Sequence, residues 1–293
     1  MFDQIIQVEF NVSDNSGVLY VIATPIGNLQ DISFRAKQIL QEVDLILAED
    51  TRHSRILLEH LHIETPMQSY HEFNEQTAIP DLLTLLKRGS RLALISDAGT
   101  PLLCDPGYPL IKAAHEHDIK LVPIPGPAAV LTALSISGMA VDKFVFEGFL
   151  SGKSAARRKR LQELTRETRT LVFYEAPHRI LDFLQEVRDI FGAERMICVC
   201  RELTKKFETI YRDSCGKVLE VLASDPMQQK GEFVVILEGA DMGQAQEPGT
   251  GERIVEILLK HGIPVKQASS ITAEITGARK NELYKLALQL SDQ

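Results

Sequence analysis

Four short segments rich in glycine, proline and polar residues each follow an apolar run directly. They read TPIGN at residues 24–28, EDTR at 49–52, DAGTPLLCDPG at 97–107 and PGPAA at 125–129. Glycine and proline set special backbone angles and let the main chain approach a bound molecule closely. Small residues at a helix start leave N–H groups free for a carboxylate or phosphate. Turn formation would explain any one segment, but four at equivalent positions favour a ligand site.

A second group of charged residues lies at the ends of apolar runs further along the chain. These residues lie in FYEAPHR at 173–179, CRELTKKFE at 200–208 and KGEFV at 230–234. Pro177 suits the first turn of a helix, which would place Glu175 near a helix N-terminus. The alternative is that four of these residues form structural ion pairs between loops: Glu175, Arg179, Arg201 and Glu202.

Several familiar catalytic and cofactor motifs do not occur. The chain has no GxGxxG after its first apolar run, no GxxxxGK[ST] and no GxSxG, which argues against a dinucleotide-binding Rossmann domain, a P-loop NTPase and an α/β-hydrolase. His53, His60 and His62 lack an HExxH pattern, and the four cysteines form no CxxC pair. The sequence therefore predicts neither a metal site nor a disulfide framework.

The elements that must position the first four segments alternate between two patterns. Apolar runs at 17–23, 44–49, 91–96 and 119–124 predict strands, and the stretches 31–43, 54–61, 81–87 and 108–117 predict helices. Such alternation is typical of a parallel sheet. Ligands bind beyond the carboxyl ends of the strands in these sheets, so we expect the four segments to share one edge.

The second half of the chain has a different pattern. Strands are predicted at 144–150, 170–174, 195–200, 208–212 and 232–237, a loop at 239–251, and helices at 252–260, 265–275 and 280–290. The last helices have helix-turn-helix-like spacing around Gly262 and Gly277, which is weak support for nucleic-acid binding. We predict an α/β protein of three parts: an N-terminal domain with a parallel sheet (17–126), a C-terminal domain with a mixed sheet (127–240) and a helical extension (252–293).

Composition limits the class of protein. The 293 residues are about twice a typical domain of ~150. With 44% hydrophobic and 25% charged residues, the chain is neither collagenous nor disordered. Its 32 Lys and Arg against 40 Asp and Glu, a net charge of −8, argue against non-specific coating of nucleic acid.

One segment has the opposite charge. Residues 153–169 hold seven Lys and Arg against two Glu, a local charge of +5. A solvated helix face would explain such a run, but contact with phosphates would make it a substrate surface. The candidate phosphate-binding residues in this run are Arg157, Arg158, Lys159 and Arg160.

No segment is expected to enter a membrane. The first sixteen residues contain no Lys or Arg, and the longest weakly polar run, 128–141, is about fourteen residues. A membrane-spanning helix needs about 20. We therefore expect a soluble, cytoplasmic protein without a secretory signal.

Seven segments together resemble one protein family. The strings LYVIATPIGNLQDIS, ILAEDTRHS, ISDAGTPLLCDPG, PIPGPAA, FYEAPHR, CRELTKKFE and KGEFV are similar to those of ribosomal RNA small-subunit methyltransferase I. This family lies within the tetrapyrrole-methylase-like, class III S-adenosylmethionine-dependent methyltransferases. Two positions depart from its pattern, since Cys104 stands where Ser is usual and Phe73 where His is common.

The resemblance implies a fold, a cofactor and a reaction. It implies two tetrapyrrole-methylase-like α/β domains with the active-site cleft between them, in a homodimer. It further implies binding of S-adenosylmethionine and 2′-O-methylation of a cytidine in 16S ribosomal RNA of the small subunit. The residues expected to bind the cofactor by this resemblance are Pro25, Ile26, Gly27, Asp97, Ala98, Gly99, Thr100, Pro101, Pro127, Ala128, Ala129, Tyr174 and Phe233.

Transfer of a methyl group to a ribose hydroxyl needs in-line alignment and a group to accept the proton. Glu49 and Asp50 are the candidates to orient or deprotonate the 2′-hydroxyl. Arg52 and Arg201 are the candidates to hold the flanking phosphates. This chemistry requires no metal.

Three other functions are compatible with parts of the sequence. A class III methyltransferase could act on a small molecule such as a tetrapyrrole, although the basic run and the EDTR and YEAPHR segments count against this. A metal-dependent phosphohydrolase could use Glu49, Asp50, Asp97 and Asp105. A ribosome-assembly factor could keep the fold without catalysis.

Overall fold

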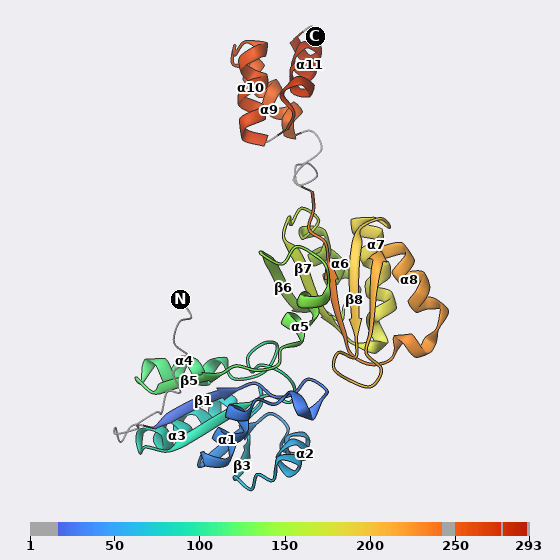
Figure 1. Ribbon diagram of the computed structural model, residues 1–293. Coiled ribbons are helices and arrows are strands. Elements are labelled where there is room, and N and C mark those ends of the chain that lie inside the picture. The colour runs from blue at the N-terminus through green and yellow to red at the C-terminus, as the bar shows by residue number, and fades with distance from the viewer. Residues whose placement is uncertain (1–16, 242–249, 277, 292–293) are drawn as a thin grey trace, which may run out of the picture. The chain divides into compact units, whose positions relative to one another are not determined.

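The computed structural model describes residues 17–241, 250–276 and 278–291 (Figure 1). These residues divide into two compact units. The first comprises residues up to Thr132 together with Glu202–Glu208, and the second comprises Ala133–Arg201 and the residues from Thr209 onward. Residues 242–249 of the predicted linker and Gly277 lie outside the described residues.

The first unit contains a five-stranded parallel sheet of order β3-β2-β4-β1-β5. Its strands are β1 (Val18–Ile22), β2 (Leu45–Ala48), β3 (Met67–Ser69), β4 (Arg91–Ile95) and β5 (Lys120–Ile124). Its helices are α1 (Phe34–Glu42), α2 (Thr51–Leu61), α3 (Glu75–Lys87) and α4 (Tyr108–Glu116), with a 3-10 turn at Leu29–Asp31. The prediction of a parallel sheet is confirmed, and β3 is an additional edge strand.

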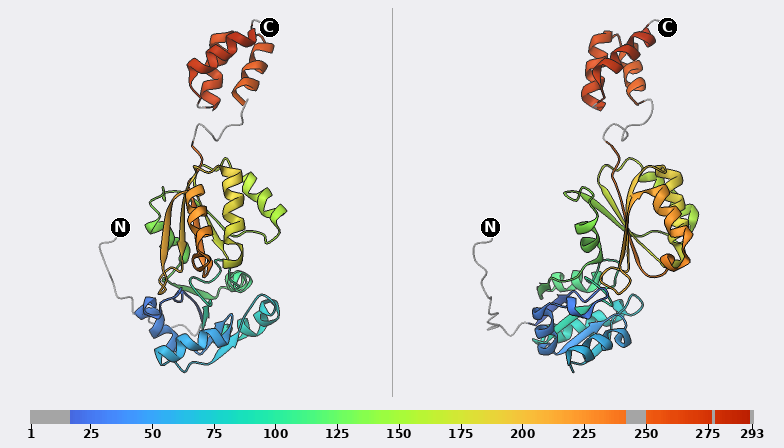
Figure 2. Two further views of the ribbon diagram at one scale, coloured as in Figure 1. Left: turned by 90° about the vertical axis from the view of Figure 1, so that its right-hand side faces the viewer. Right: turned by 45° about the vertical axis from the view of Figure 1, so that its right-hand side comes forward.

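Helices cover both faces of this sheet (Figure 2). Alternate residues of a strand point to opposite faces, so Val18, Tyr20 and Ile22 pack with α1 and α2. Leu19 packs with α3 and α4 on the other face. Burial on both faces explains why these strands are continuous apolar runs. The loops after the strands are thereby held at one edge of the sheet.

The second unit contains a five-stranded mixed sheet of order β6-β7-β10-β8-β9. β6 (Phe144–Phe149) is parallel to β7 (Thr170–Glu175), whereas β10 (Phe233–Leu237), β8 (Met196–Arg201) and β9 (Thr209–Ser214) pair antiparallel. The helices are α6 (Ser154–Glu163), α7 (Ile180–Phe191) and α8 (Cys215–Ser224), with 3-10 turns at Pro177–Arg179 and Pro226–Gln229. α5 (Ala129–Ile136) spans the residues at which the two units divide. The predicted mixed sheet is confirmed.

Three helices form a small bundle near the C-terminus: α9 (Thr250–Lys260), α10 (Val265–Thr276) and α11 (Lys280–Ser291). Val255, Leu283 and Ala287 are buried at its centre. The predicted helical C-terminal segment is therefore confirmed. Over the described residues, no helix combines the length and the apolar character needed to span a bilayer.

Candidate functional site

Hydrogen bonds join the four predicted loop segments at the carboxyl edge of the first sheet. The Thr24 N–H donates to the Gly99 carbonyl at 2.8 Å, and the Gly99 N–H donates back to Thr24 at 3.1 Å. The Thr100 hydroxyl donates to the Pro127 carbonyl at 3.0 Å. Because the Asp50 N–H also donates to the Asp97 carboxylate, the segments after β1, β2, β4 and β5 are one connected surface, as their positions after parallel strands predict.

Two glycines in this surface are required by local geometry. Gly99 has a φ of +91°, and a Cβ there would lie 3.3 Å from Cγ2 of Ile26. At Gly27 a Cβ would lie 2.4 Å from Cγ of Lys205 and 3.1 Å from the Leu203 carbonyl. Gly27 thus lets residues 202–208 pack on the loop after β1, a role that the sequence did not indicate.

The loop after β4 contains unusual backbone conformations. Leu102 and Cys104 have φ values of 72° and 73°, and Gly107 has a φ of 133°. Left-handed conformations are costly for residues other than glycine and collect at functional sites. The strain therefore supports a functional assignment for the segment that carries Asp105.

Three carboxylates lie near one another at this edge. Burial raises the pKa of Glu49, and the negative charges of Asp97 and Glu72 raise it further. Burial, followed by the charge of Glu49, raises the pKa of Asp105 to about 7. The Asp97 carboxylate accepts a hydrogen bond from the Asp50 N–H at 3.0 Å. Mutual repulsion in this cluster favours any cation that binds there.

Asp105 was predicted only as a ligand in the phosphohydrolase alternative. Its DPG sequence reads as a simple turn, and only the fold brings it near Glu49. Among the described residues, no group of three or more His, Cys, Asp or Glu is arranged to hold a metal ion.

Asp50 and Arg52 form a local unit at the start of α2. The Asp50 carboxylate caps the helix by accepting the Arg52 N–H at 2.8 Å. The Arg52 guanidinium donates to its two oxygens at 3.1 and 2.7 Å. These bonds lower the pKa of Asp50. Asp50 is therefore a poor proton acceptor but a stable anion, and the side chain of Arg52 is 90% exposed.

Two predicted site residues of the second unit, Phe233 and Arg201, have buried side chains with structural contacts. Phe233 is buried in the hydrophobic core that includes Phe173 and Phe183. Arg201 is also buried, and its guanidinium donates to the carbonyls of Lys230 and Met227 at 2.6 and 3.1 Å. We therefore assign Phe233 to the core and Arg201 to support of the chain at residues 227–230, because neither side chain is open to a ligand.

The remaining predicted residues of this unit lie at the end of β7. The half-buried Tyr174 ring contacts Phe146 and Phe149 edge-on, with centroids 4.9 and 5.5 Å apart. Next to it, Arg179 bonds the buried carboxylate of Glu175 at 2.7 Å. Glu175 and Arg179 thus form a structural ion pair within one segment and not between loops, and Tyr174 stays a predicted cofactor residue.

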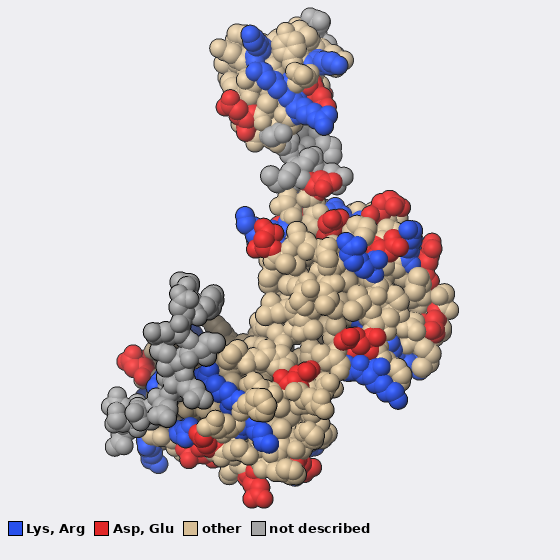
Figure 3. Space-filling view, in the orientation of Figure 1, with Lys and Arg blue, Asp and Glu red and all other residues tan. Residues whose placement is uncertain are grey.

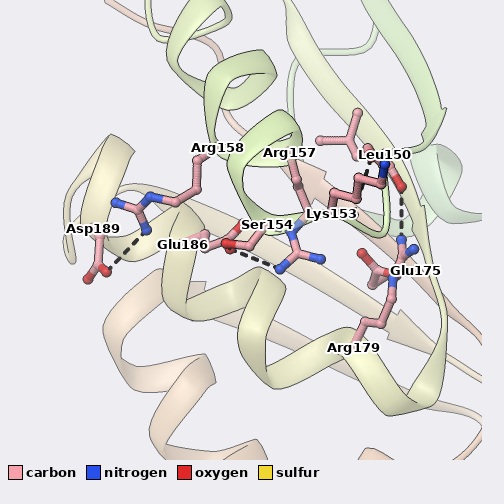
Figure 4. Close-up of polar contacts among 10 residues, drawn as sticks. Leu150, Lys153, Ser154, Arg157, Arg158, Glu175, Arg179, Glu186 and Asp189 are labelled. Atoms are coloured by element: carbon pink, nitrogen blue, oxygen red, sulfur yellow. Dashed lines mark hydrogen bonds and ion pairs between the residues drawn. The ribbon is translucent and has the colours of Figure 1, made fainter.

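Residues 154–163 of the basic run form α6, and three of its arginines pair with carboxylates from elsewhere in the unit. Figure 4 shows Arg157 reaching Glu186 and Arg158 reaching Asp189, both on α7. The Arg157 guanidinium is 4% exposed and contacts the two Glu186 oxygens at 2.6 and 2.9 Å. Arg157 therefore does not offer its charge to a phosphate in this structure.

The surface charge of the run is lower than its sequence indicates. Arg158 lies 3.7 Å from Asp189, and Arg160 lies 2.8 Å from Glu147. The carboxylates of Glu147, Glu186 and Asp189, which lie outside the run, therefore offset part of its local charge of +5. On the face in Figure 3, basic and acidic side chains are interspersed over the two sheet-containing units, and basic ones are prominent on the helical bundle.

Comparison with known proteins defines the class. The family of Tetrapyrrole (Corrin/Porphyrin) Methylases matches residues 18–219. The methyltransferase CobJ is similar in structure, with a TM-score of 0.56 and 17% identity over 78% of this chain and 95% of that one. A uroporphyrin-III-C-methyltransferase from Thermus thermophilus has a TM-score of 0.54 and 14% identity over 76% and 94% of the two chains. Fold and site thus define a protein of the tetrapyrrole methylase class.

Closer relatives define the family within that class. A Pseudomonas aeruginosa protein named ribosomal RNA small subunit methyltransferase I is 49% identical over 94% of this chain and 98% of its own length. An Escherichia coli O157:H7 protein of the same name is 46% identical over 94% and 97%. Residues 245–291 match the RsmI C-terminal HTH domain. This chain belongs to the ribosomal RNA small subunit methyltransferase I family, which confirms the resemblance noted from its motifs.

Proposed function

We propose that this chain is a methyltransferase that transfers a methyl group from S-adenosylmethionine to the 2′-hydroxyl of a cytidine in 16S ribosomal RNA. The observation that carries the proposal is the 46–49% identity to ribosomal RNA small subunit methyltransferases I over 94% of the chain. The joined loops and the carboxylate cluster at the edge of the first sheet provide groups suited to this chemistry.

The edge of the first sheet fits a sulfonium cofactor in two respects. Its loops are held together by hydrogen bonds between Thr24 and Gly99 and between Thr100 and Pro127, which gives a cofactor a preformed surface. Burial and neighbouring carboxylates raise the pKa of Glu49 and of Asp105, and a positive charge would relieve that repulsion. When bound, the cofactor supplies an electrophilic methyl group.

The proposed cofactor residues are grouped by loop. We place the cofactor along Pro25, Ile26 and Gly27, along Asp97 to Pro101, and along Pro127, Ala128 and Ala129. Tyr174 is a further candidate. Since the Thr100 hydroxyl donates to Pro127, it can still accept a hydrogen bond through its oxygen lone pairs.

Glu49 and Asp50 have different proposed roles because their environments differ. The raised pKa of Glu49 brings this carboxyl closer to the range of an effective general base. Asp50 stays ionised and positions Arg52, whose guanidinium is the proposed contact for a phosphate next to the target ribose. Alignment supplies a large part of such an acceleration, and general base catalysis contributes about 10²–10⁴-fold.

The function is tested with small ribosomal subunits from cells that lack this methylation. Purified protein and labelled S-adenosylmethionine should introduce one methyl group, and mass spectrometry of nuclease fragments should place it on a cytidine ribose. A tetrapyrrole substrate in a parallel reaction tests the small-molecule alternative. Binding to the subunits without methyl transfer would instead support a non-catalytic assembly factor.

We also propose a cytoplasmic homodimer. Phe144 and Phe149 are exposed on β6, an edge strand of the second sheet. Exposed apolar side chains on such a strand favour contact with another protein surface. Analytical ultracentrifugation should give twice the 32.7 kDa mass of the chain, and a monomer at micromolar concentration would contradict the proposal.

A further inference from the structure

Three phenylalanines of the first unit expose most of their side chains. The exposed fractions are 96% for Phe34, 86% for Phe73 and 62% for Phe207. Aromatic rings contribute to stability mainly when they are buried, so these rings add little to the fold. Phe34 opens α1 after β1, Phe73 follows β3, and Phe207 belongs to residues 202–208, which pack on Gly27. All three segments follow or contact the carboxyl edge of the first sheet.

Phe73 is held outward by a turn that is itself well fixed. The His71 N–H donates to Oδ1 of Asn74 at 2.8 Å, and Nδ2 of Asn74 donates to the Ser69 carbonyl at 2.9 Å. The Asn74 N–H also donates to the His71 carbonyl at 3.0 Å. The Phe73 ring meets the His71 ring edge-on at 5.9 Å. The turn therefore presents one face of the Phe73 ring to solvent with little flexibility in the backbone.

This turn is next to the proposed catalytic carboxylates. β3 pairs with β2 through Ala48 and Ser69, and the Tyr70 N–H donates to the Ala48 carbonyl at 2.8 Å. The residues that follow on the two strands are Glu49 and Asp50 on one side and the turn at 71–74 on the other. The exposed Arg52 comes two residues after Asp50.

We propose that Phe73 stacks on a nucleobase next to the methylated nucleotide, while Arg52 contacts a phosphate of the same single-stranded RNA segment. The inference rests on the proposed function and names the groups that grip the substrate. Proteins recognise unpaired RNA by stacking its bases on aromatic rings and by pairing cations with its phosphates. Here a fixed, exposed ring and an exposed guanidinium flank the carboxylates that would receive the ribose hydroxyl.

The surroundings of the ring favour RNA over a protein partner. Apolar protein contacts use contiguous apolar patches, but the neighbours of Phe73 in the turn are His71, Glu72 and Asn74. A base needs only one flat apolar face, and its edge hydrogen-bonds to polar groups. A ring carried by a turn of otherwise polar residues matches that requirement.

The test measures binding of unmethylated small subunits by Phe73→Ala, Phe73→Leu and Phe73→Trp variants. Loss of one stacked base is expected to weaken binding by about 5- to 150-fold in the Ala and Leu variants, with a matching rise in KM. The Trp variant should stay within about threefold of the parent, because its ring also stacks. Ile56→Ala on α2, which removes another exposed apolar side chain of the same unit, should change nothing.

Three outcomes would overturn the inference. Parent-like affinity of the Ala variant would show that the ring makes no contact with the substrate. Parent-like affinity of the Leu variant would show an apolar contact with protein instead of stacking. A change of the Ala variant from dimer to monomer in ultracentrifugation would show that a second copy covers the ring. Failure of the proposed function is separate, since the parent protein itself would then methylate no subunits.

Discussion

Removal of the Arg157 side chain is expected to destabilise the second unit strongly. In the Arg157→Ala variant, Glu186 loses two charge-assisted hydrogen bonds of 2.6 and 2.9 Å and keeps one from Ser154 at 2.6 Å. Hydrogen bonds to charged groups contribute about 1.5–3 kcal/mol each. Two of them give about 3–6 kcal/mol, which agrees with the ~3–5 kcal/mol cost of leaving a buried charge without its partner.

The assay is urea denaturation followed by circular dichroism, with a neighbouring ion pair as the control. Arg158 and Asp189 lie 3.7 Å apart with 40% and 38% of their side chains exposed. Because such surface pairs contribute less than about 1 kcal/mol, the Arg158→Ala variant should unfold close to the parent. Replacing Arg157 and Glu186 together by Met should recover most of the loss, since no buried charge then remains.

Comparing the stability of the Arg157→Ala and Arg158→Ala variants can refute the assignment of Arg157 to a buried ion pair. If Arg157→Ala and Arg158→Ala lower the free energy of unfolding equally and by less than about 1 kcal/mol, Arg157 is not held in a buried pair. Its guanidinium would then be available to a phosphate, as the charge pattern of the sequence indicates.

Three further predictions follow from the site. Asp50→Ala should retain binding of S-adenosylmethionine in calorimetry but lose methyl transfer, and unchanged turnover would remove Asp50 from the mechanism. The folded-state pKa of Asp105, about 7, lies above its ordinary 3.8, so the folded protein binds more protons and stability should fall as pH rises from about 4 to 7. Asp105→Asn should flatten this trend in urea titrations, and an unchanged slope would contradict the assignment. Neutralising Arg158, Lys159 and Arg160 to Gln should weaken binding to rRNA and reduce its salt dependence. If affinity and slope stay the same, α6 is only a solvated surface.

The fold was predictable where the pattern of apolar residues is strong. The strands of the parallel sheet are buried on both faces, which requires continuous apolar runs and makes them visible in the sequence. β3 was not predicted because its three residues, Met67–Ser69, are few and mostly polar. It is an edge strand that depends on hydrogen bonds to β2, such as that of Tyr70 to Ala48, rather than on burial of its side chains.

The loops that form the candidate site could be predicted from the sequence, but the protonation behaviour of its carboxylates could not. The order of strands and turn segments was enough to place TPIGN, DAGTP and PGPAA at one edge, because parallel strands end on the same side. The protonation behaviour of Asp105 depends on its burial beside Glu49, which lies 56 residues earlier in the chain. No local pattern encodes that proximity.

The order of residues along the chain was therefore enough to predict the helices and strands, the shared edge of the parallel sheet and the family, since these depend on neighbouring residues. The partners of long side chains were decided only by tertiary structure. Arg157 belongs to a basic run in the sequence, yet α7 brings Glu186 to it and removes its charge from the surface. Phe73 is the converse, because an apolar residue that the sequence alone would assign to a core keeps its ring 86% exposed. Coulomb attraction and burial act through space, so they depend on which elements pack together and not on spacing in the sequence.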